Sequence, residues 1–144
     1  MQVAADQPAE ALRAQDYDAL ALVGSPQWEG PRAPYVGAIL AEAHGAGKVI
    51  GAICGATLAF ARAGLLNDLR HTSNSLDYLQ QNAGNYRGGG FYANTAGAVS
   101  DGGVITAPGS APVTFASAML RALLPDRQPA IAAFTALCAR EHAA

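Results

Sequence analysis

The chain has 144 residues, of which 51% are hydrophobic and only 14% are charged, and its formal net charge is −2. This length fits one domain with a buried core, so we expect residues 1–144 to form a single domain. The small net charge and the lack of a basic cluster argue against nucleic acid or an anionic membrane as a partner. The longest uncharged apolar stretch, 49–61, is shorter than the ~20 residues that a membrane span needs.

The elements expected along the chain alternate between strands and helices, which is typical of an α/β fold with a mostly parallel sheet and helices on both faces. We expect strands at 18–23, 48–53, 70–73 and 104–107, helices at 35–46, 55–62, 75–83, 111–124 and 129–142, a proline-rich loop at 25–34, a mobile glycine-rich segment at 84–90 and a turn at 101–103. Few charges remain for the surface of such a fold, so we expect a homo-oligomer, a dimer or larger.

The N-terminus and the cysteines indicate the compartment. Asp6 and Glu10 lie where a signal peptide would have a basic segment followed by an apolar block, so we predict a cytoplasmic protein. The two cysteines, Cys54 and Cys138, form no CxxC or zinc pattern, and a reducing cytoplasm disfavours a disulfide between them. We therefore expect no metal and no cofactor.

Cys54 is the most informative residue of the chain. It follows the apolar strand 48–53 and precedes a turn of small residues that leads into the helix 55–62. A strand–nucleophile–helix turn lifts a side chain above the sheet, and the amides at the start of the helix favour a thiolate. The alternative is a buried cysteine that acts as a small apolar residue at the end of a strand.

Three segments resemble the DJ-1/PfpI (ThiJ/PfpI) superfamily, relatives of the class I glutamine amidotransferases. They are Gly-Ala-Ile-Cys-Gly-Ala-Thr at 51–57, Tyr-Asp-Ala-Leu-Ala-Leu-Val-Gly-Ser at 17–25 and Val-Ser-Asp-Gly-Gly-Val-Ile-Thr-Ala at 99–107. Ala-Gly-Leu-Leu at 63–66 and Arg-His-Thr-Ser-Asn at 70–74 also fit. The resemblance implies a flavodoxin-like sandwich with Cys54 near the carboxyl edge of the sheet, where ligands bind in such folds.

The same resemblance implies an oxyanion hole. Two sets of backbone amides would hold the developing negative charge, those at Gly24–Ser25 and that at Gly55. Gly24–Ser25 stands where the family has Gly-Gly. Peptidase-like members have a histidine directly after the cysteine, whereas this chain has Gly55. The resemblance also implies an opening β-α-β segment with a glutamate that touches the cysteine, and residues 1–16 are too short to supply it.

The remaining candidates are partners for the thiol, which needs a base or a hydrogen-bond donor. His71 lies after the helix 55–62 that follows Cys54, and it is the candidate base or polariser. The alternative is a structural histidine at the end of a strand. Asn74 lies near a position where some relatives carry a histidine, so it either binds substrate or belongs to a turn. Glu29 follows Gly24–Ser25 at the spacing of the acidic residue in the peptidase branch, and it is otherwise a solvated loop carboxylate.

Two functions of different classes follow. The first is an enzyme, a cysteine-dependent hydrolase or a glutamine amidotransferase-like enzyme, that acts on a small carbonyl or amide substrate as an amidase, peptidase or glyoxalase. The second is a non-enzymatic redox or stress sensor based on reversible oxidation of Cys54. A non-catalytic remnant that is stabilised by oligomerisation is a third interpretation. The sequence does not choose among them.

Overall fold

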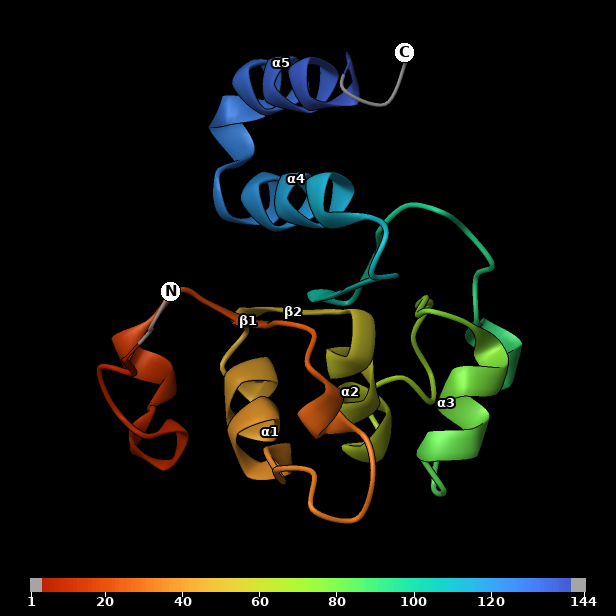
Figure 1. Ribbon diagram of the computed structural model, residues 1–144. Coiled ribbons are helices and arrows are strands. Elements are labelled where there is room, and N and C mark those ends of the chain that lie inside the picture. The colour runs from red at the N-terminus through yellow and green to blue at the C-terminus, as the bar shows by residue number, and fades with distance from the viewer. Residues whose placement is uncertain (1–3, 141–144) are drawn as a thin grey trace.

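A four-stranded sheet with the strand order β1-β2-β4-β3 forms the centre of the computed structural model, which describes residues 4–140 (Figure 1). The strands are β1 (Ala19–Leu22), β2 (Val49–Ile53), β3 (Val99–Asp101) and β4 (Val104–Ala107). β2 lies parallel to both β1 and β4, and β3 runs antiparallel to β4. The mostly parallel sheet expected from the sequence is confirmed.

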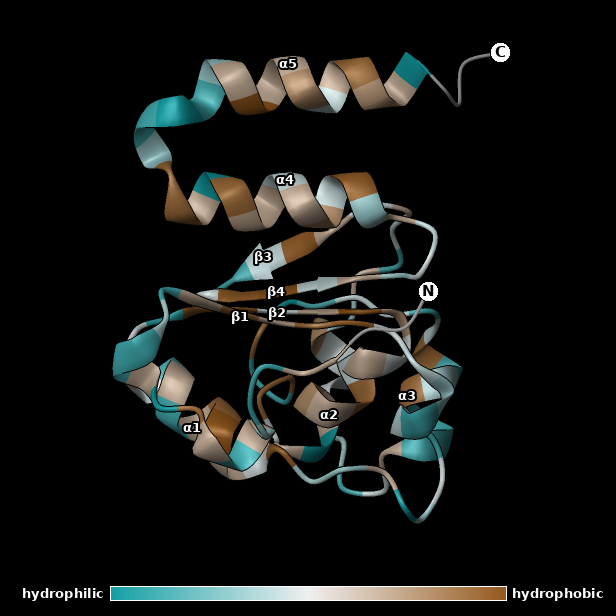
Figure 2. Cartoon of the chain, turned by 60° about the vertical axis from the view of Figure 1, so that its left-hand side comes forward, coloured by the Kyte–Doolittle hydropathy of each residue, from teal (hydrophilic) through white to brown (hydrophobic). Residues whose placement is uncertain are grey.

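The five α-helices found within residues 4–140 divide between the two faces of this sheet. They are α1 (Gly37–Gly45), α2 (Thr57–Arg62), α3 (Leu76–Asn82), α4 (Pro112–Leu123) and α5 (Gln128–Ala139). α1, α2 and α3 lie on one side, α4 covers the other side, and α5 packs on the outer surface of α4 (Figure 2). This arrangement is the flavodoxin-like sandwich that the sequence predicts.

Both faces of the sheet are packed, which explains why its central strands are continuous apolar runs. Phe60 and Leu40 are fully buried in the core on the side of α1 and α2. On the opposite side, Phe115 and Met119 of α4 cover Ile105. Because both cores hold β2 and β4 in place, the carboxyl ends of these strands form a rigid platform for the loops that follow them.

Two local expectations differ from the structure. The segment expected as a strand at 70–73 forms only an isolated bridge between His71 and Tyr92. The glycine-rich segment 84–90 leads into a 3₁₀ turn (Gly88–Phe91), and Gly88 is buried where the Leu66 carbonyl leaves no room for a Cβ. Close packing, rather than mobility, therefore accounts for this glycine.

The last helix ends at Ala139 in the structure, and the expected residues 141–142 lie outside the described part of the chain. Within residues 4–140, every helix is too short or too polar to cross a membrane.

Candidate functional site

Cys54 occupies the turn between β2 and α2, in a 3₁₀ segment (Cys54–Ala56) that precedes the α-helix. Its φ of 60° makes it the single non-glycine residue with a positive φ among the described residues. L-residues other than Gly, Asn and Asp rarely adopt this conformation, and a strained backbone at a strand–helix turn is typical of a nucleophile elbow. The Thr57 hydroxyl donates to the Cys54 carbonyl at 2.7 Å and lies 2.7 Å from the Ser73 hydroxyl. These two contacts hold the turn in place.

Two glycines, in the loops that follow the strands on either side of β2, allow the chain to pass close to the thiol. Gly24 follows β1, and a Cβ there would lie 2.7 Å from the Cβ of Cys54. Gly109 follows β4, and a Cβ there would lie 2.8 Å from the Cys54 Sγ. The loops after three adjacent parallel strands therefore converge on Cys54, at the edge of the sheet where ligands bind in this class of fold.

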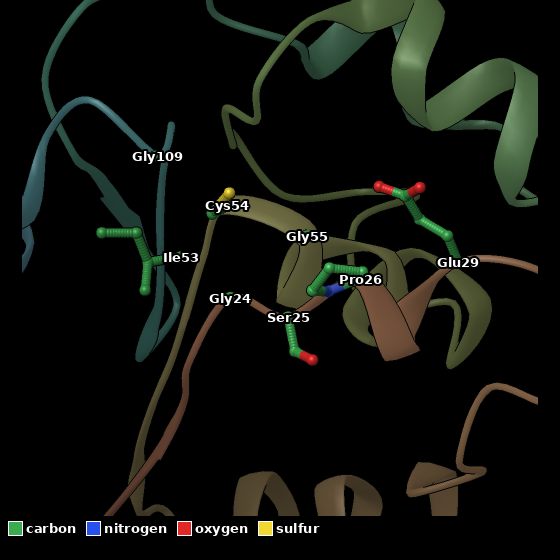
Figure 3. A pocket seen from close by; sticks show the side chains of 8 residues that line it. All are labelled: Gly24, Ser25, Pro26, Glu29, Ile53, Cys54, Gly55 and Gly109. Atoms are coloured by element: carbon green, nitrogen blue, oxygen red, sulfur yellow. The ribbon is translucent and has the colours of Figure 1, made fainter. Parts of the chain in front are cut away.

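A cavity of about 400 Å³ opens beside Cys54 (Figure 3). Its lining consists of Gly24, Ser25, Pro26, Glu29, Ile53, Cys54, Gly55 and Gly109. The structure therefore brings together five of the residues singled out in the sequence: Gly24, Ser25, Glu29, Cys54 and Gly55. The Ser25 side chain points away from the cavity and accepts a hydrogen bond from the Gln27 N–H at 3.2 Å, so Ser25 presents its backbone to the site.

Asn74 is the side chain that hydrogen-bonds the thiol. Its Nδ2 donates to the Cys54 Sγ at 3.6 Å, and its Oδ1 accepts from the Gly109 N–H at 3.0 Å. The second bond orients the amide, because only the oxygen can accept from a backbone N–H and the nitrogen is then directed at the sulfur. Asn74 therefore joins the loop after β4 to the nucleophile.

Glu29 is held at the cavity by a residue that sequence reasoning missed. The Tyr78 hydroxyl of α3 donates to the Glu29 Oε1 at 2.9 Å. Burial raises the pKa of Tyr78, and the hydrogen bond to Glu29 raises it further, so the phenol stays protonated and remains a donor. A tyrosine three residues after a Ser cap carries no sequence feature that points to a site, so only the fold could reveal this pair.

His71 lies in a buried cluster of its own. Its Nδ1 lies 2.7 Å from the Leu69 carbonyl, and its Nε2 lies 2.6 Å from the Tyr86 hydroxyl. Burial lowers the pKa of His71, so the ring is neutral: Nδ1 donates to the carbonyl, which can only accept, and Nε2 accepts from Tyr86.

Both ring nitrogens of His71 are therefore in use, and no hydrogen bond joins the ring to Cys54 within residues 4–140. This placement matches the structural alternative for His71 rather than the expected base.

The two cysteines of the chain are both free thiols. No group of three His, Cys, Asp or Glu side chains that could hold a metal ion is found in the described part of the chain. The polar groups at the cavity or beside the thiol are the sulfur of Cys54, backbone amides, the amide of Asn74 and the carboxylate of Glu29.

Comparison with known proteins identifies the class to which this fold and site belong. The sequence profile of the DJ-1/PfpI family matches residues 1–122, and the chain belongs to this family. A solved DJ-1 superfamily protein from Agrobacterium tumefaciens is similar, with 37% identity and a TM-score of 0.79, over 89% of this chain and 69% of that one. A ThiJ/PfpI family protein from Bacillus anthracis has 38% identity and a TM-score of 0.66, over 72% of this chain and 48% of that one.

A curated relative from Bacillus subtilis is named as the uncharacterized protease YoaZ. It is 49% identical over 77 residues, which are 54% of this chain and 36% of the relative. The match thus spans about a third of the curated relative.

Proposed function

We propose that this chain is a cysteine-dependent hydrolase that acts on a small carbonyl or amide substrate, with Cys54 as the nucleophile. The observation that carries the proposal is the positive φ of Cys54 at a strand–helix turn, beside a cavity where the loops after three parallel strands meet. The protease name of the Bacillus subtilis relative fits the same class of chemistry.

In the proposed reaction of an amide, the Cys54 sulfur attacks the carbonyl carbon and forms an S–C bond, while the π electrons move to the oxygen. Collapse of this intermediate expels the amine, which takes the thiol proton directly or through water, and leaves a thioester. Water then cleaves the thioester to a carboxylic acid and returns the thiol. Because both ring nitrogens of His71 are hydrogen-bonded to Leu69 and Tyr86, we assign the transfer of these protons to solvent water.

The backbone amides of Ser25 and Gly55 are the donors that we assign to the developing oxyanion. Both residues line the cavity beside Cys54, and neither N–H donates a hydrogen bond within residues 4–140. Loss of one such donor costs roughly 3 kcal/mol of transition-state stabilisation in enzymes where this has been tested. Asn74 is the residue that we assign to the thiolate, because its amide is already directed at the sulfur.

The decisive experiment compares two single variants against a panel of small amides and dicarbonyl compounds. Release of amine or loss of the dicarbonyl should disappear in Cys54→Ser and persist in Cys138→Ser, which removes the other thiol of the chain. Activity that survives in Cys54→Ser would overturn the proposal.

A second candidate function is a redox or stress sensor without turnover. It is favoured by the partners of the sulfur, because within the described residues Cys54 hydrogen-bonds an amide and neither an imidazole nor a carboxyl group. A thiolate that attacks hydrogen peroxide becomes a sulfenate and releases water, and a dithiol reductant reverses the step. Reversible oxidation of Cys54 by peroxide, seen by mass spectrometry in a protein without turnover, would select this function.

A further inference from the structure

We propose that Glu29 makes the cavity selective for compounds with a positively charged group near the reacting carbon, such as small amides with a free amine, over anionic ones. The part of this inference that concerns substrates rests on the proposed function. The part that concerns binding of charged compounds near Cys54 depends only on the geometry of the cavity.

The first observation is the charge of the lining. Glu29 contributes the single carboxylate, and none of the other lining residues is cationic. In Figure 3 the carboxylate of Glu29 and the Sγ of Cys54 rise on the same side of the ribbon, on either side of Gly55. A compound that places its carbonyl at the sulfur thus extends toward a negative charge.

The second observation is that no ion pair within residues 4–140 involves the carboxylate of Glu29. Within residues 4–140 the one salt bridge joins Lys48 to Asp18, and Glu29 has no cationic partner. Arg32 shares a separate hollow with Glu29 and makes no ion pair with it. Tyr78 bonds only Oε1, which leaves Oε2 as an acceptor for a ligand. Charge-assisted bonds from an ammonium group to a carboxylate are stronger than neutral ones.

The third observation is that the carboxylate is held in place before any ligand arrives. Tyr78 fixes its position, and the loop that carries it is anchored at the preceding residue. The Trp28 Nε1 donates to the Val23 carbonyl at 2.8 Å, and Arg62 donates to the Trp28 carbonyl at 2.7 Å. A preorganised group loses less conformational entropy on binding, so its charge discriminates between ligands more effectively.

The test measures alkylation rates, which require no turnover. Cys54 is labelled with 2-bromoethylammonium, iodoacetamide and iodoacetate, which carry a positive, a neutral and a negative charge. Each rate is divided by the rate at Cys138 in the same molecules, which corrects for the intrinsic reactivity of the reagent. The variants are Glu29→Gln and, as a matched control, Glu10→Gln, which removes an exposed carboxylate outside the cavity lining.

In the unmodified chain the cationic reagent should be favoured over the anionic one more strongly at Cys54 than at Cys138. Glu29→Gln should reduce this preference by about threefold to fivefold, as expected for an exposed charge, while labelling by iodoacetamide is unchanged. Raised salt should weaken the preference in the unmodified chain and leave Glu29→Gln unaffected. Glu10→Gln should behave like the unmodified chain.

Two outcomes would overturn the inference. An unchanged ratio of the cationic to the anionic labelling rate in Glu29→Gln would mean that the carboxylate does not act on bound charge. An equal slowing of all three would mean that Glu29 acts on the thiol itself.

If no amide is turned over but the charge preference depends on Glu29, the proposed hydrolase fails and the selectivity stands. If amides are turned over, Glu29→Gln should lower kcat/KM for an amino amide and not for its N-acetylated twin.

Discussion

The two cysteines of this chain lie in opposite kinds of surroundings, although both are partly exposed free thiols. Cys54 sits in a strained turn, within hydrogen-bond reach of Asn74 and in close contact with the loops after β1 and β4. Cys138 lies in the regular helix α5, and its thiol has no hydrogen-bond partner in the described part of the chain. The difference shows that convergent loops, rather than the residue type, make a thiol a candidate nucleophile.

The region around Cys138 is held by few interactions. Ile131 is the one buried residue of α5, and a hydrogen bond of 2.7 Å joins the hydroxyl groups of Ser117 and Thr135. Phe134 and Leu137 are 41% and 62% exposed. The helix is therefore an outer layer on α4, whereas the elbow is built into the sheet.

The largest expected effect concerns this outer layer. Ile131→Ala removes the main buried contact of α5, so we expect a loss of about 3 kcal/mol in the free energy of unfolding. Labelling of Cys138 should become faster, and labelling of Cys54 should not change. Urea unfolding and alkylation with mass spectrometry measure the two effects.

Leu137→Ala, at an exposed site on the same helix, is the control and should change stability by less than about 0.5 kcal/mol. Equal losses in both variants would mean that the outer face of α5 is covered in solution.

The next effect should be confined to the elbow. Gly109→Ala places a methyl group 2.8 Å from the Cys54 Sγ, so the turn must shift, at a cost of about 1–3 kcal/mol. We expect alkylation of Cys54 to change by about tenfold, with Cys138 unaffected. Gly84→Ala is the matched control, because nothing lies within 4 Å of a Cβ at that position. An equal response of the two glycine variants would contradict the close approach at Gly109.

Asn74→Asp separates the structural and the electrostatic role of Asn74. The aspartate can still accept from the Gly109 N–H, but it replaces the donor to the sulfur with a negative charge that disfavours the thiolate. The pH midpoint of Cys54 alkylation should therefore rise by roughly one on the pH scale, and the rate at neutral pH should fall several-fold. At high pH the two rates should converge. Asn85→Asp, whose amide bonds the Arg62 carbonyl, should leave the midpoint unchanged.

The smallest effect is a change in the pH dependence of stability. The pKa of His71 is lowered in the folded chain, so the unfolded chain binds more protons as the pH falls below about 6.5. The contribution of the neutral ring is therefore present above this pH and is lost as the pH falls toward the lowered value. In His71→Gln, the free energy of unfolding should depend less steeply on pH below about 6.5. A slope equal to that of the unmodified chain would contradict the buried neutral ring.

The sequence predicts the sheet and the elbow well because both depend on local patterns. Apolar runs define β1, β2 and β4, and small residues after Ile53 mark the turn at Cys54. Spacing from recognisable motifs points to Glu29 and Asn74, and both lie at or beside the thiol.

The remaining features depend on contacts between distant segments. The Tyr78 partner of Glu29 lies 49 residues away along the chain, and the Gly109 partner of Asn74 lies 35 residues away. His71 is polar and close to the elbow in sequence, but its environment is set by Tyr86 and Tyr92, which no local pattern relates to it. Such pairings become visible only when the chain is folded.

The positive φ of Cys54 also affects how this protein would respond to selection for thermal stability. Glycine adopts this conformation without the penalty of roughly 1–2 kcal/mol that a Cβ imposes. A laboratory evolution experiment that rewards only a higher Tm should therefore enrich Cys54→Gly, which also removes the thiol of the proposed nucleophile. Backbone conformation alone therefore favours glycine over cysteine at this position.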